Sequence, residues 1–185
     1  MALEEIQLSD LVDELDEEQN DYANFFRPML GYDAFLTLYE GIDDSFEPLL
    51  AEVEDEVGYE FPPDLIALYI CSNGGKYGGM TLFPLTNDKD VSETINKLNV
   101  FDKSLKASLG LNNATLLLGR YGNLTNYVIC YLKDEDTYSY AVYNGEKKEI
   151  RMEFESIAEL VALEVSYVAD YDGFMDYINK GKENK

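Results

Sequence analysis

The sequence predicts an α+β fold, a mainly antiparallel sheet of about five or six strands flanked by helices. Up to residue 75, apolar residues recur with the spacing of a helix face. After residue 80, runs of β-branched, aromatic and aliphatic residues alternate with turn signals. A Ser-x-x-Glu capping box at Ser156 then opens a final helix. Because consecutive strands with short links pair as antiparallel neighbours, this order of elements indicates an α+β domain.

Residues 1–41 are expected to form an acidic helical extension that packs on the core. Four apolar residues near the start fall on one face of a short amphipathic helix: Leu8, Leu11, Val12 and Leu15. The stretch 13–21 (DELDEEQND) gives the other face a strong negative charge. Residues 22–41 mix aromatic residues with proline and glycine, and we interpret them as a connecting segment. Residues 42–180 are expected to form the main domain, so that the whole chain is a single globular unit.

Two helices are expected at the start of the main domain. Apolar residues between positions 42 and 57 follow a helical period, and Gly58 is placed to end this helix. Pro62-Pro63 allows a second, largely buried helix to begin, because the first turn of a helix needs no backbone donor. Asn73-Gly74-Gly75 is interpreted as the left-handed C-cap of that helix. The glycines at positions 74–79 are then expected to form a flexible loop.

The second half of the chain is expected to supply the strands. They cover the runs 80–85, 114–119, 126–132, 138–143 and 149–154, and one or two short helices fill residues 88–110. Asn144-Gly145 is a hairpin turn signal, since both residue types tolerate positive φ. In the final helix we expect Val168 to face the core and Asp172-Gly173 to break the helix before a last short one. The predicted core contains Phe46, Leu50, Val53, Leu65, Leu68, Tyr69, Leu117, Val128 and Ile157.

The charge of the chain is strongly negative and unevenly distributed. The formal net charge is −23, and residues 1–60 hold 19 acidic residues but one basic residue, Arg27. Such a field repels phosphate backbones, which excludes direct nucleic-acid binding, and attracts a basic protein partner. The partner-binding surface is expected at the acidic face formed by Asp13, Glu14, Glu17 and Glu18, with Asp134, Glu135 and Asp136 as a second candidate. The alternative is that the acidity only keeps the protein in solution.

The composition excludes several kinds of enzyme. The chain has no histidine, so Ser-His-Asp triads, Cys-His pairs and HExxH zinc sites are ruled out. Its two cysteines, Cys71 and Cys130, lie far apart in apolar runs and are expected to be buried, reduced thiols. Asp88, Asp90 and Ser92 have the spacing of a calcium loop but lack its glycine and its closing glutamate. We therefore expect no catalytic residue, no cofactor and no metal. The remote alternative is an acid-base hydrolase that uses a pair of carboxylates, although no pair stands out in this acidic chain.

The chain carries no sign of a membrane segment. No apolar run approaches the ~18 residues that a membrane span needs. The N-terminus lacks the basic start and apolar core of a signal peptide. The expected location is the cytoplasm.

The segment from residue 42 to residue 75 resembles the SMI1/KNR4 (SUKH) superfamily. That superfamily has an acidic helix ending in glycine, a Leu-Pro or Phe-Pro step, a helix that carries an aromatic residue, and an Asn-Gly-Gly terminus. The matching residues here are Gly58, Pro62, Tyr69, Asn73, Gly74 and Gly75, with Gly119 in a later glycine-containing turn, LLLGRYGN. The resemblance covers roughly residues 42–168 and implies a SUKH fold, with the acidic N-terminus as an extension.

The resemblance also implies a binding role. Many bacterial members resemble immunity proteins, which bind and neutralise a cognate toxin, often a nuclease. We therefore expect a bacterial immunity protein without enzymatic activity, whose partner is a basic toxin domain, and which is itself a monomer or a weak homodimer. The alternative is a regulatory or scaffold domain without a toxin, as fungal members of the superfamily suggest. A neighbouring gene for a large secreted toxin would separate the two.

Overall fold

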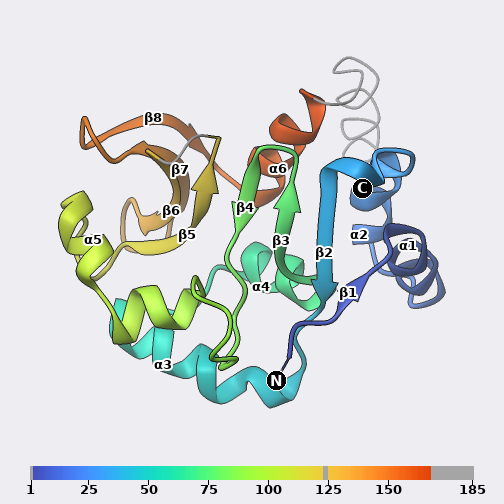
Figure 1. Cartoon of the computed structure of the whole chain (residues 1–185), viewed down its shortest axis with the longest axis horizontal. Helices are drawn as coiled ribbons and strands as arrows, with labels where there is room; N and C mark the ends of the chain where they lie inside the picture. Colours follow the sequence, from blue (N-terminus) through green and yellow to red (C-terminus); the bar gives the residue numbers. More distant parts are fainter. Residues whose placement is uncertain (1, 123–124, 168–185) are drawn as a thin grey trace.

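The computed structural model, drawn in Figure 1, describes residues 2–122 and 125–167. Its centre is an eight-stranded sheet in which every strand pairs antiparallel with its neighbour in the sequence. The strands are β1 (Glu5–Ile6), β2 (Leu36–Glu40), β3 (Ser72–Tyr77), β4 (Met80–Leu82), β5 (Leu116–Tyr121), β6 (Asn126–Leu132), β7 (Tyr138–Asn144) and β8 (Glu149–Phe154). The predicted α+β class and antiparallel pairing are confirmed.

The number of strands was predicted too low, because the sheet has eight and not five or six. The three strands that the sequence pattern missed are β1, β2 and β3. β1 has two residues, too few to show alternation, and β3 reads Ser-Asn-Gly-Gly-Lys-Tyr, without one β-branched residue. β2 lies in the segment that we interpreted as a connection. Residues 1–41 therefore contribute two strands to the common sheet as well as helices.

Helices lie at both ends and in the middle of the sheet (Figure 1). The α-helices are α1 (Leu8–Glu17), α2 (Tyr22–Phe26), α3 (Glu47–Val57), α4 (Pro63–Cys71), α5 (Ser104–Leu109) and α6 (Ile157–Ser166). Shorter helical turns cover Arg27–Met29, Asp33–Phe35, Asp44–Phe46 and Lys97–Phe101. α4 and α6 pack on each other and on β3, whereas α1 and α2 pair beside the β1–β2 end.

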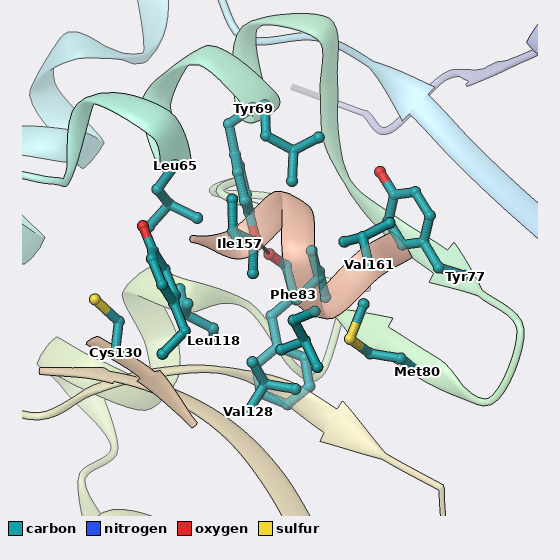
Figure 2. Packing of buried hydrophobic residues seen from close by; sticks show 14 of the residues in the cluster. Leu65, Tyr69, Tyr77, Met80, Phe83, Leu118, Val128, Cys130, Ile157 and Val161 are labelled. Atoms are coloured by element: carbon teal, nitrogen blue, oxygen red, sulfur yellow. Dashed lines mark hydrogen bonds between the residues drawn. The ribbon is translucent and has the colours of Figure 1, made fainter. Parts of the chain in front are cut away.

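The core lies between the central helices and the sheet, as Figure 2 shows. Leu65 and Tyr69 of α4, Ile157 of α6 and Val128 of β6 belong to one cluster, and all four are buried. Each such side chain contributes about 1.5–3 kcal/mol when it is fully buried. Seven of the predicted core residues are buried: Val53, Leu65, Leu68, Tyr69, Leu117, Val128 and Ile157.

Phe46 and Leu50 are only partly buried, contrary to the prediction. The sequence pattern was interpreted as one helix from residue 42, but a helical turn of the tighter 3₁₀ type covers Asp44–Phe46 and α3 begins at Glu47. The change of helix type rotates Phe46 away from the buried face of α3, which Val53 and Val57 form.

We predicted that Asn73-Gly74-Gly75 forms a helix C-cap. The structure shows instead that these residues belong to β3. Ser72 is already extended, with φ −149° and ψ 120°, so the chain passes directly from α4 into the strand. Gly74 and Gly75 have φ values of 72° and 130°. A Cβ atom at Gly75 would lie 2.3 Å from the carbonyl oxygen of Thr37 in β2. Glycine is required here because β3 passes closely between β2 and β4. The glycine-rich segment that we expected to be a flexible loop forms the β3–β4 hairpin.

Most helix ends agree with the sequence signals. Gly58 ends α3 with φ 86°, and α4 begins at Pro63 after Pro62. The Ser156 hydroxyl accepts a hydrogen bond of 3.2 Å from the backbone N–H of Glu159, which confirms the capping box. The predicted two-residue hairpin turn is instead a loop of residues 145–148. Its positive φ, 54°, falls on Lys148 and not on Gly145.

The predicted strand at 80–85 is shorter than expected, because β4 ends at Leu82, two residues before Pro84. Val168 and the predicted helix break at Asp172-Gly173 lie outside the described residues.

Candidate partner-binding surface

The first candidate surface is the outer face of α1. The apolar residues of this helix, Leu8, Leu11, Val12 and Leu15, are buried, which fixes its orientation. The helical period then turns Asp13, Glu14, Glu17 and Glu18 outward, and all four side chains are exposed. None of the four makes an ion pair within residues 2–122 and 125–167. The predicted acidic face therefore exists as a contiguous set of exposed carboxylates on one helix.

An ion pair holds this helix against the turn that follows α2. The Arg27 guanidinium donates two hydrogen bonds, of 2.9 and 2.6 Å, to the two carboxylate oxygens of Asp16. This contact lowers the pKa of the Asp16 carboxyl. Asp16 is the carboxylate of α1 that pairs with Arg27, and this pair links α1 to the turn after α2.

The second candidate surface is the exposed turn between β6 and β7, which carries Asp134, Glu135 and Asp136. A hydrogen bond of 2.8 Å from the N–H of Lys133 to the carbonyl of Thr137 closes this turn. The Thr137 side chain and the backbone N–H of Asp136 lower the pKa of the Asp134 carboxyl, which stays ionised.

Tyr138 fixes the position of this turn in the fold. Its hydroxyl donates a hydrogen bond of 3.2 Å to the carbonyl of Glu60, and its ring lies 5.8 Å from the ring of Tyr59. Burial raises the pKa of the Tyr138 hydroxyl, and the negative charge of nearby groups, among them Glu60 and Asp136, raises it further. The turn therefore adjoins the link between α3 and α4.

The two candidate surfaces are not brought together. α1 lies beside the β1–β2 end of the sheet, and the β6–β7 turn belongs to the other end (Figure 1). A single small ligand therefore cannot contact both sets of carboxylates, whereas a large protein partner can use either one.

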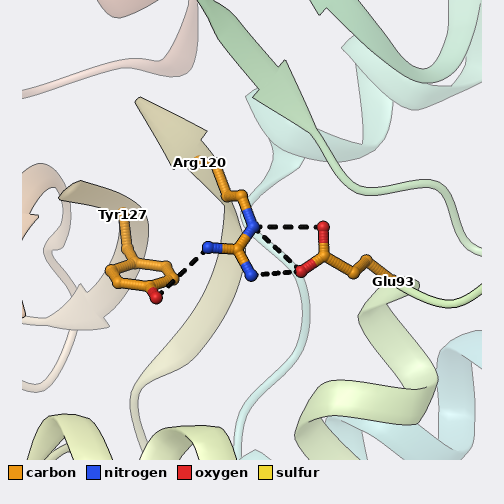
Figure 3. A network of polar contacts seen from close by, with 3 residues as sticks. All are labelled: Glu93, Arg120 and Tyr127. Atoms are coloured by element: carbon orange, nitrogen blue, oxygen red, sulfur yellow. Dashed lines mark hydrogen bonds and ion pairs between the residues drawn. The ribbon is translucent and has the colours of Figure 1, made fainter. Parts of the chain in front are cut away.

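Basic side chains in the middle of the chain are engaged in internal contacts. Figure 3 shows Arg120 of β5, which donates from Nε to both carboxylate oxygens of Glu93 at 2.9 and 3.1 Å. The same guanidinium donates to the Tyr127 hydroxyl at 3.2 Å and lies 5.1 Å from the centre of that ring. Lys103 pairs with Glu56 of α3. These cations fasten loops to the sheet and to α3, so they do not neutralise the two acidic surfaces.

Two further lysines serve the same internal role. The Lys97 ammonium donates to the carbonyl oxygens of Asp88, Lys89 and Val91 and so holds the preceding loop. Lys106 of α5 is buried and donates to the carbonyl of Asn113 at 3.1 Å. Burial lowers the pKa of its ammonium to about 8, and the positive charge of Lys103 adds to the shift.

Six of the seven residues that carry the family motif are buried, and Gly58, at the end of α3, is exposed. Tyr69 is buried, and its hydroxyl donates a hydrogen bond of 2.6 Å to the carbonyl of Phe83. The Asn73 amide makes two hydrogen bonds to the backbone of Leu85, of 2.9 and 2.8 Å. A Cβ atom at Gly119 would lie 2.1 Å from the carbonyl oxygen of Thr81, where β4 meets β5. The contacts of Tyr69, Asn73 and Gly119 join elements of the sheet and the core, so these three residues have a structural role.

Two acidic residues have structural roles that the sequence analysis missed. Asp64 accepts a hydrogen bond of 2.7 Å from the Tyr140 hydroxyl and one of 3.1 Å from the backbone N–H of Ile157, so it connects α4 with β7 and α6. Glu164 is buried and accepts a hydrogen bond of 2.6 Å from the N–H of Gly79. The position of Glu164 on the apolar face of this helix, between Val161 and Val165, was the signal that could have revealed its role.

The chemistry available to the side chains is limited. Cys71 and Cys130 are buried and reduced, as the sequence predicts. Burial raises the pKa of the Cys71 thiol to about 12, and Glu18 and Glu14 add to the shift, so this thiol is neutral. Among the described residues, no cysteine, aspartate and glutamate side chains gather in a group of three or more that could hold a metal ion. In the same residues no helix is long and apolar enough to cross a membrane.

Comparison with known proteins identifies the family. Neither the curated proteins nor the solved structures contain a significant match to this chain. The model of the SMI1/KNR4 family (SUKH-1) matches residues 47–163, from the first residue of α3 into α6. The matched segment contains β3 to β8, whereas α1, β1 and β2 precede it. Because the match spans more than half of the sequence, the chain belongs to the SMI1/KNR4 family (SUKH-1).

Proposed function

We propose that this protein is a non-enzymatic binding module, an immunity protein that binds a basic toxin domain in the bacterial cytoplasm and neutralises it. The observation that carries the proposal is the outer face of α1, where Asp13, Glu14, Glu17 and Glu18 are exposed. Membership of the SMI1/KNR4 family supports it, because the resemblance implies a binding role. The carboxylates of the β6–β7 turn form a second, smaller contact.

Electrostatics explain how such a surface would neutralise a nuclease. A nuclease holds its substrate through cationic side chains that contact phosphates. An acidic protein surface competes for those cations, and its long-range field accelerates encounter with the toxin. The carboxylates of α1 are presented on a helix that four buried apolar residues and the Arg27–Asp16 pair hold in place. Binding therefore orders little backbone, which lowers its entropic cost.

The direct test is neutralisation in cells. A toxin gene that neighbours the gene for this protein, once located, is expressed alone, with the wild-type protein, or with the variant Glu14→Lys/Glu17→Lys. The wild-type protein should restore growth, and the variant should restore it poorly. The matched control is Glu52→Lys/Asp55→Lys, which reverses two exposed carboxylates with the same spacing on α3. This control changes the net charge equally and should restore growth as the wild type does.

Two outcomes would contradict the proposal. If both variants protect cells as well as the wild type, the α1 face does not bind the toxin. If the wild-type protein protects against no neighbouring toxin, the family role that applies is the regulatory or scaffold one.

A further inference from the structure

The two edges of the sheet differ in length. Within the described residues, β1 forms one edge with two residues, and β8 forms the other with six. Figure 1 shows β8 on the outside of the β5–β8 half of the sheet. An edge strand presents backbone N–H and C=O groups that can pair with another extended segment. Only β8 is long enough to accept such a segment among the strands described.

A groove lies beside β8 on one face of this half-sheet. It has a volume of about 340 Å³ and runs between the α5–β5 link and strands β6 to β8. Its apolar lining includes Leu111, Tyr131, Leu132 and Ile150. Ile150, in β8 itself, is 44% exposed, and Leu132, at the end of β6, is 37% exposed. The edge strand therefore adjoins an apolar depression that nothing in the described part of the chain fills.

The charges around this edge indicate the occupant. From residue 132 to residue 155 the chain carries seven carboxylates and four cations, Lys133, Lys147, Lys148 and Arg151. Two of these cations already pair with carboxylates of β8, Lys133 with Glu153 at 2.6 Å and Lys147 with Glu149 at 4.0 Å. The three exposed carboxylates of the turn that follows Leu132 make no ion pair within the described residues. A second copy of a chain with net charge −23 would be repelled, whereas a basic segment would be attracted.

We propose that an extended, lysine- or arginine-containing segment of the protein partner adds to β8 as a ninth strand. Its backbone pairs with the free edge of β8, and an apolar side chain beside Ile150 enters the groove. Its basic side chains face the carboxylates of the β6–β7 turn. This inference rests on the proposed function and names a contact separate from α1, so that α1 steers the partner and β8 anchors it.

The proposal is tested with a short synthetic peptide of alternating lysine and valine. Backbone amide hydrogen exchange of the full chain is measured alone and with the peptide. With the peptide at about ten times its Kd, exchange in Glu149–Phe154 should slow about tenfold. A second peptide of the same sequence, N-methylated at every residue, keeps the charge but has no backbone N–H group with which to pair as a strand. It should protect α1 at most and leave exchange in β8 unchanged.

Variants show whether the groove takes part. Ile150→Ser should weaken peptide binding at least about tenfold, because the apolar contact is lost. The matched control is Ile70→Ser on α4, at a side chain that is 53% exposed and does not line the groove. This control should bind the peptide as the wild type does. Circular dichroism of both variants verifies that they remain folded.

Protection that is equal with both peptides, or that is confined to α1, would overturn the proposal, and so would an unchanged Kd for Ile150→Ser. The peptide measurements do not involve a toxin. Failure at β8 with normal neutralisation in cells would therefore remove only this contact, whereas failure of neutralisation with strand addition intact would remove only the immunity role.

Discussion

The segment before the family match and the segment within it differ in how far basic residues balance their acidic residues. Residues 1–46 carry 13 acidic residues and one basic residue, and that base forms their single ion pair in the described structure. Residues 47–163 carry 19 acidic and ten basic residues and contain the four other ion pairs. The family segment thus neutralises much of its own charge, whereas the preceding segment directs its charge to solvent. The two segments nevertheless share one sheet, through the pairing of β2 with β3.

The largest expected effect is at the joint between these two segments. Gly75→Val would place a Cβ atom 2.3 Å from the carbonyl of Thr37 at a φ of 130°, which a β-branched residue adopts only under strain. The free energy of unfolding should fall by more than about 3 kcal/mol. Gly58→Ala is the control, because it has a positive φ but no atom within 4 Å of the added Cβ. Urea denaturation should show a loss of about 1 kcal/mol for the control.

A pair of cavity variants tests whether the two segments unfold together. Leu15 of α1 and Leu68 of α4 are both buried. Leu15→Ala and Leu68→Ala should each lower the free energy of unfolding by about 2–5 kcal/mol. If the segments form one cooperative unit, both variants shift the same single transition in a thermal melt. A separate early transition that moves only in Leu15→Ala would show that the N-terminal segment unfolds independently.

Partly buried and exposed ion pairs should differ in their contribution to stability. Arg120 contacts Glu93 and the Tyr127 ring within the family segment, and Arg120→Met should cost about 1–3 kcal/mol. Arg27 and Asp16 are both more than one-third exposed, and Arg27→Met should cost less than about 1 kcal/mol. Chemical denaturation of the two variants in the same buffer compares them. Equal losses would mean that burial does not distinguish the two pairs.

Lys106 should make stability depend weakly on pH. Burial lowers the pKa of its ammonium to about 8, whereas the unfolded chain has the ordinary value of 10.5. Between these values the unfolded state binds more protons, so the contribution of Lys106 to the free energy of unfolding rises with pH. Lys106→Met should remove this rise. The measurement is the difference in the free energy of unfolding between variant and wild type, from pH 7 to pH 9.5. Parallel curves over that range would show that Lys106 is not protected from solvent.

Much of the fold could be predicted from local signals. Gly58, Pro63 and Ser156 mark helix ends through chemistry that acts within one turn, and the strands from β5 to β8 are rich in residues that pack on a pleated surface. β3 could not be predicted, because its glycines are selected by the closeness of two neighbouring strands and not by strand propensity. Contacts with neighbouring strands decide the secondary structure of such a segment.

The candidate surface was predicted in part. Helical periodicity places the α1 carboxylates on one exposed face, and the structure agrees. The separation of α1 from the β6–β7 turn depends on the order of strands, which no local pattern contains. The role of Asp64 likewise depends on Tyr140 and Ile157, both more than 70 residues away along the chain.

The central claim is that the acidic face of α1 captures a basic toxin domain. The most direct measurement is the association rate of the purified toxin domain with this protein across a range of salt concentrations, for the wild type and both charge-reversal variants. Screening shortens to ~8 Å at physiological salt, so the wild-type rate should fall steeply as salt rises. Glu14→Lys/Glu17→Lys should associate more slowly with a shallower salt dependence, and Glu52→Lys/Asp55→Lys should follow the wild type more closely. Association rates that are the same in all three proteins and at every salt concentration would contradict the claim.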